Sequence, residues 1–170
     1  MFEILQSLFD ICLFKKRPQD LPYSLLLLQL LAIINAISSF LILYIRYDWL
    51  NSLLQSLVGI ALVTGFSWII LYLYRKLPRF NQTTAALLGT DAVIGFFALP
   101  AMATMMTGHG ELLAFIVMLG LIGWHWAIIG HIIRNALEQS LSMSLGLAFL
   151  YLLVSYQVMA LLFPEVAEIK

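Results

Sequence analysis

Five long apolar stretches constrain the fold of this chain more than any other feature of its sequence. They occupy residues 21–45, 49–74, 83–106, 112–133 and 141–163. Only the third contains a charged side chain. A helix of about 20 apolar residues spans the hydrocarbon core of a bilayer, which is about 30 Å thick. The sequence therefore predicts an all-α polytopic membrane protein, built as a bundle of five transmembrane helices.

The composition excludes several other classes of protein. Of the 170 residues, 62% are hydrophobic and 11% are charged, whereas a soluble domain has roughly 25% charged residues. Nine basic and nine acidic residues give a net charge of zero, so no basic field attracts nucleic acid. Cys12 is the only cysteine, which excludes an intrachain disulfide and a multi-cysteine metal site. The expected partner is the lipid bilayer.

The residues before the first long stretch predict a short amphipathic helix. In residues 1–14 four polar side chains recur at the helical spacing i, i+3, i+4, i+7. They are Glu3, Gln6, Ser7 and Asp10. The segment is too short to cross a bilayer, so we expect it to lie in the membrane interface or against the bundle. The expected organisation is this helix with a basic connection at 1–20, a transmembrane domain at 21–164 and a short tail at 165–170.

The distribution of basic residues predicts the orientation in the membrane. Five spans place successive connections on alternate sides, and one side would then hold seven basic residues. These are Lys15, Lys16, Arg17, Arg75, Lys76, Arg79 and Arg134. The other side would hold only Arg46 and Lys170. Because basic residues favour the cytoplasmic side, we expect a bacterial inner-membrane protein with a cytoplasmic N-terminus and a periplasmic C-terminus.

Asp91 is the only formal charge among the 31 residues from Phe80 to Gly110. An intramembrane carboxylate is costly, so it normally faces protein or water and has a partner. If the third and fourth spans are antiparallel neighbours, His125 lies at the same depth as Asp91. One hypothesis is a proton relay or coupling-ion site. The other is a structural polar contact that joins the two spans.

A second pattern near the end of the third span has two interpretations. Met102, Met105, Met106 and His109 recur at i, i+3, i+4, i+7. Thioether and imidazole groups suit copper(I), whereas methionines also fill gaps in apolar packing. These residues are therefore weak candidates for a metal site, and the sequence leaves the metal unknown.

Small residues form a stripe on the fourth span. They are Gly120, Gly123, Ala127 and Gly130, at spacings of 3, 4 and 3. Small residues let helix backbones approach closely and pack by van der Waals contact. The stripe predicts a helix–helix contact, either inside the bundle or with a homo-oligomeric copy or another membrane protein.

The order of these features resembles the plan of Yip1-like membrane proteins, with a cytoplasmic N-terminal segment and five closely spaced spans. Three stretches also look like blocks of small uncharacterised bacterial inner-membrane proteins: Arg17 to Ser24, Gly89 to Ala92, and His131 to Leu137. The resemblance implies the five-span fold and an external C-terminus. It carries no functional residues.

The sequence contains no motif of a known catalytic site. Neither a HExxH zinc-protease pattern nor a GxSxG nucleophile pattern occurs, and no cofactor is expected. The first hypothesis is a non-enzymatic membrane subunit or assembly and scaffold factor that acts through helix–helix contacts. The alternative is a small proton- or cation-coupled transporter or channel-like protein that uses Asp91 and His125. An enzyme acting on lipid is a third hypothesis.

Overall fold

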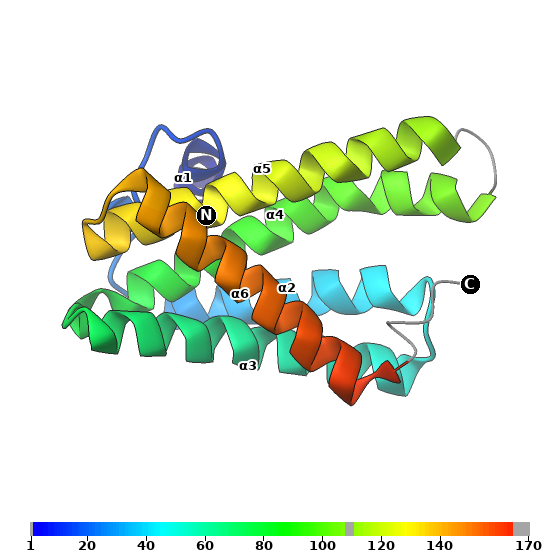
Figure 1. The fold of residues 1–170 in the computed structure, drawn as a ribbon, viewed down its shortest axis with the longest axis horizontal. Coiled ribbons are helices and arrows are strands. Elements are labelled where there is room, and N and C mark those ends of the chain that lie inside the picture. The colour runs from blue at the N-terminus through cyan, green and yellow to red at the C-terminus, as the bar shows by residue number, and fades with distance from the viewer. Residues whose placement is uncertain (1, 108–110, 165–170) are drawn as a thin grey trace.

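A computed structural model describes residues 2–107 and 111–164 as a bundle of helices (Figure 1). The helices are α1 (Phe2–Cys12), α2 (Leu25–Tyr44), α3 (Trp49–Leu73), α4 (Phe80–Thr107), α5 (Glu111–Leu137) and α6 (Leu141–Leu162), with short 3₁₀ turns η1 (Pro18–Asp20) and η2 (Leu77–Arg79). Five of them, α2 to α6, are long and apolar enough to cross a membrane. The prediction of an all-α fold with five such helices is confirmed, and the chain is a multi-pass membrane protein.

Helix α4 is the centre of the bundle. It contacts α1, α2, α3 and α5, and every residue from 83 to 90 is buried. Helix α6 packs mainly on α5 and contacts α3 less extensively. In Figure 1 it runs diagonally across the other long helices. Asp91, the charged residue of α4, therefore lies on the span that is buried most extensively inside the described bundle.

Helix boundaries follow local capping chemistry. The side chains of Ser24 and Ser140 accept hydrogen bonds from backbone amides at the starts of α2 and α6.

Helix α5 extends beyond its predicted end near residue 133 and continues to Leu137. No Pro or Gly interrupts that turn, and the helix ends because Glu138 adopts a left-handed conformation, with φ 58°. The next amide, that of Gln139, then donates to the Arg134 carbonyl at 3.2 Å, which closes the last turn.

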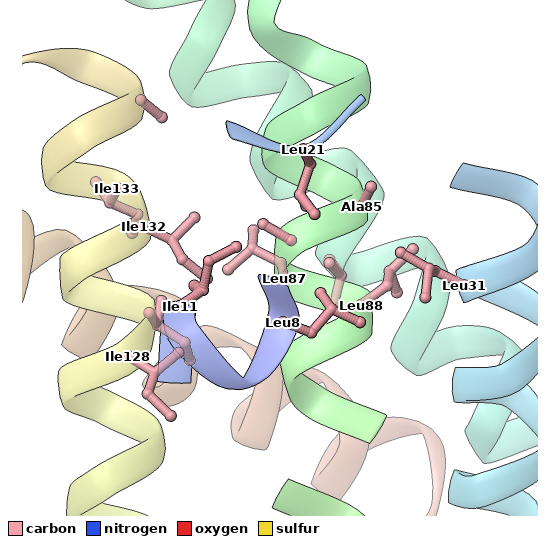
Figure 2. Packing of buried hydrophobic residues seen from close by; sticks show 14 of the residues in the cluster. Leu8, Ile11, Leu21, Leu31, Ala85, Leu87, Leu88, Ile128, Ile132 and Ile133 are labelled. Carbon is pink, nitrogen blue, oxygen red and sulfur yellow. The ribbon is translucent and has the colours of Figure 1, made fainter. Parts of the chain in front are cut away.

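Helix α1 packs against the bundle, one of the two placements expected for it. Figure 2 shows α1 lying between α4 and α5. Leu8, Ile11 and Cys12 are at most 3% exposed. The backbone of α4 leaves room for Leu8 at Gly89, where an added Cβ would lie 2.6 Å from a Leu8 methyl carbon. The apolar face of α1 is therefore part of the core.

Candidate functional site

The structure brings Asp91 of α4 and His125 of α5 into direct contact. Nε2 of His125 lies 2.8 Å from Oδ1 of Asp91. The side chains of His125 and Asp91 are 24% and 19% exposed. The contact joins α4 to α5. The sequence predicted that Asp91 and His125 lie at the same depth if these two spans are antiparallel neighbours.

The chemistry of this pair is the sharing of a proton. A proton on Nε2 of His125 can be donated to the carboxylate, or a protonated Asp91 can donate to a neutral imidazole. In lipid either arrangement satisfies two groups that would otherwise be costly. The contact can therefore join two helices, hold a proton, or do both.

Two further polar contacts surround the pair. Trp124, the neighbour of His125, donates from Nε1 to the Cys12 carbonyl of α1 at 3.0 Å. Asn35 of α2 is 5% exposed and donates to the Leu88 carbonyl of α4 at 3.0 Å. Helices α1, α2 and α5 are thus each joined to a neighbour by a polar contact near the level of Asp91.

The small-residue stripe of α5 is divided into two parts. At Gly130 an added Cβ would lie 2.6 Å from Leu145 Cδ2 and 3.5 Å from the Leu145 backbone Cα, so α6 approaches closely there. At Gly120 and Gly123 an added Cβ would meet nothing within 4 Å. Ala127, between them, is half-buried. The C-terminal part of the stripe is an intrachain contact, and the N-terminal part has no neighbour in the described residues.

The methionine pattern is only partly within the described structure. Met102 is half-buried on α4. The side chains of Met105 and Met106 and all of His109 lie outside what is described. Within residues 2–107 and 111–164, no group of three or more His, Cys, Asp and Glu side chains could hold a metal ion.

A polar cluster at one end of the bundle was not expected from the sequence. We call this end, which carries Lys15, Arg79 and Arg134, the basic end. A cavity of about 630 Å³ opens there, and it is lined by six of the residues between 14 and 20, by Arg79 and by five of the residues between 131 and 139. The sequence signal for this cluster is the basic run at residues 15–17.

Hydrogen bonds between distant segments build the walls of this cavity. His131 donates from Nε2 to the Lys16 carbonyl at 2.9 Å, and Gln19 donates from Nε2 to the Asn135 carbonyl at 2.6 Å. Arg79 donates from Nη1 to the Ala136 carbonyl at 2.9 Å. The segment before α2 and the residue before α4 are thereby fixed to the end of α5.

Glu138 completes the cluster at the surface. Its carboxylate accepts a hydrogen bond from Lys76 Nζ at 2.6 Å and one from Arg79 Nη2. These hydrogen bonds from Lys76 and Arg79, together with the two positive charges, lower the pKa of Glu138 to about 2. Glu138 is therefore ionised at neutral pH and joins the turn before α4 to the turn after α5.

No protein-family model, curated protein or solved structure matches this chain. The resemblance to Yip1-like proteins therefore stays a prediction.

Proposed function

We propose that this protein is a non-enzymatic subunit or assembly factor of a bacterial inner membrane, which binds a transmembrane helix of a partner through the N-terminal half of α5. One observation carries the proposal. Gly120 and Gly123 have open space in front of them, while Gly130 of the same stripe is filled by Leu145.

The intrachain contact indicates what such a stripe does in this protein. At Gly130 the missing side chain lets α6 approach the α5 backbone. Gly120 and Gly123 offer the same kind of groove about two to three turns earlier, flanked by apolar side chains such as Ile116, which is 56% exposed. Because lipid tails are as apolar as these side chains, a second helix gains mainly from close van der Waals packing. Glycines on an open helix face favour that packing.

The distribution of basic residues indicates in which half of the bilayer the Gly120–Gly123 surface of α5 lies. With the basic end in the cytoplasm, the N-terminal half of α5 lies in the periplasmic half of the bilayer. The partner helix would therefore pack in that half of the membrane.

In-membrane photo-crosslinking with mass spectrometry tests this proposal. Wild type, Gly120→Leu and Gly123→Leu are compared at matched expression, and Gly146→Leu is the control. Gly146 also has open space in front of it, but it lies on α6. We expect a discrete crosslinked species, either a second copy or another membrane protein, that both α5 variants lose and Gly146→Leu retains. A crosslinking pattern that is the same in all four proteins would refute the proposal.

The contact between Asp91 and His125 favours a second candidate function, a proton- or cation-coupled transporter. Both side chains keep some exposure, at 19% and 24%, and a carboxylate beside an imidazole can exchange a proton. Proton flux into liposomes containing the purified protein tests it. Flux that exceeds that of empty liposomes, is lost in Asp91→Asn and persists in Asp10→Asn would support transport. Equal flux with and without protein would exclude it.

A further inference from the structure

The cavity at the basic end combines a positive charge excess with a rigid frame. Five basic and two acidic side chains line it. The basic ones are Lys15, Lys16, Arg17, Arg79 and Arg134, and the acidic ones are Asp20 and Glu138. An anion inside this cavity would therefore meet a net positive field.

Some of the basic side chains are already paired within the protein. Arg79 binds Glu138, and Lys16 lies 3.5 Å from Asp10 Oδ2. Lys15 and Arg134 are exposed, and neither makes an ion pair or side-chain hydrogen bond with another described residue. They come from segments more than 100 residues apart in the chain, yet they line one cavity. The cationic groups of Lys15 and Arg134 are thus among those available to a ligand.

The helix end beside the cavity does not oppose an anion. The C-terminus of a helix carries a partial negative charge on its last carbonyls. Here Gln19 and Arg79 donate to the carbonyls of Asn135 and Ala136, so these groups are occupied. These two carbonyl oxygens are therefore not free to repel an anion in the cavity.

Gln19, a residue that lines the cavity, has a side-chain atom without a hydrogen-bond partner. Oε1 of Gln19 is buried and accepts no hydrogen bond in the described structure. The amide nitrogen of the same side chain is fixed on Asn135, so Oε1 is the atom left to accept. A buried acceptor without a donor is costly, and a hydroxyl group on a ligand would satisfy it.

The cavity also lies beside apolar surface. Leu13 and Phe14 are 51% and 46% exposed, and the ring of Phe14 packs edge-on against His131. Exposed apolar side chains next to a basic cavity at the end of the spans fit the boundary between acyl chains and headgroups. A ligand with a phosphate and an acyl tail matches both surfaces.

We propose that this cavity binds the headgroup of an anionic glycerophospholipid. Lys15 and Arg134 contact the phosphate oxygens, and Gln19 Oε1 accepts a hydrogen bond from a headgroup hydroxyl. The shared chemistry is a phosphate with a hydroxyl donor, and its source is the lipid rather than a soluble phosphate. This site is separate from the α5 surface in the proposed function and does not depend on it.

Native mass spectrometry of the delipidated, detergent-solubilised protein tests the proposal. The probes are phosphatidylglycerol, phosphatidylmethanol, which has the same charge without the hydroxyls, and phosphatidylcholine. We expect one phosphatidylglycerol to bind in preference to both other lipids. Inorganic phosphate or glycerol phosphate at millimolar concentration should displace little of it. Equal binding of phosphatidylcholine, or full displacement by soluble phosphate, would overturn the proposal.

Charge-neutralising variants locate the site. Lys15→Gln and Arg134→Gln should each weaken phosphatidylglycerol binding about fivefold, as expected for one basic side chain near an anionic lipid. Arg75→Gln is the matched control, because Arg75 is exposed in the connection between α3 and α4 but does not line the cavity. An equal loss in Arg75→Gln would mean that binding reflects only the overall charge, and it would refute the assignment to this cavity.

Discussion

The docking of α1 can be measured with the single cysteine of the protein. Cys12 is the last residue of α1, and its side chain is fully buried against the bundle. This burial, with a smaller effect of the Asp91 charge, raises the pKa of the thiol from 9.0 to about 12. The thiolate is the nucleophile that attacks maleimide, and a pKa of about 12 in place of 9.0 lowers the thiolate fraction near pH 8 about 10³-fold. Maleimide labelling of the native protein should therefore be about 10³-fold slower than labelling of the SDS-unfolded chain.

Leu8→Ala should accelerate this labelling. Leu8 is 3% exposed and fills the space over Gly89. Truncating a buried leucine costs roughly 2–5 kcal/mol in a soluble core. The low end, about 2 kcal/mol, applies here because lipid rather than water receives the exposed surface. Undocked α1 then becomes about 30-fold more populated. Because Cys12 is fully buried when α1 is docked, labelling through the undocked state should accelerate by the same factor.

Leu5→Ala is the control for this experiment. Leu5 lies on the same helix but is 51% exposed, so the variant should label at close to the wild-type rate. The reasoning would be wrong if the native protein labelled as fast as the unfolded chain. It would also be wrong if Leu5→Ala and Leu8→Ala accelerated labelling equally.

Two further predictions concern the polar contacts. His125→Leu leaves Asp91 without its partner and should lower the free energy of unfolding by about 1–3 kcal/mol. Asp91→Leu combined with His125→Leu should recover part of that loss in SDS or thermal unfolding. If the destabilisations of the two single variants simply added up in the double variant, the contact would contribute nothing to stability. Glu138→Gln should lower the melting temperature at pH 7. Because the pKa of Glu138 is lowered to about 2, its stabilisation is present above the ordinary carboxyl pKa of about 4.5 and is lost as the pH falls toward 2. The difference between variant and wild type should therefore shrink below pH 4.5, and a difference that stayed constant down to pH 3 would exclude this ion pair as its cause.

The bundle was predictable because lipid imposes simple rules on sequence. Apolar stretches long enough to cross a bilayer must be helical to satisfy their backbone groups, so the five long helices followed from the length of the apolar stretches, including the third, which contains only one charge. Antiparallel neighbours of known length also fix relative depth, which is why Asp91 and His125 could be paired before any contact was known. This argument needs only the rise per residue and the approximate ends of two helices.

The polar end of the bundle was not predictable in the same way. Its contacts join Gln19 to Asn135 and Arg79 to Ala136, residues that are more than 50 positions apart. No periodic pattern connects such positions, because one partner in each bond is a backbone carbonyl and carries no side-chain signal. The extra turn of α5 had a similar cause, since its end depends on the left-handed conformation of Glu138 rather than on a Gly or Pro.

Helix α5 holds the end of α1 and the first part of the segment between α1 and α2. Helix α5 donates to the Cys12 carbonyl from Trp124 and to the Lys16 carbonyl from His131, and it accepts from Gln19 at Asn135. Residues held through one helix do not respond independently to substitution. A variant of His125, next to Trp124, can therefore change activity either by removing a proton-carrying group or by loosening α1. Cys12 labelling separates these causes: lost function with slow labelling places the effect at the Asp91–His125 pair, whereas lost function with fast labelling places it in the docking of α1.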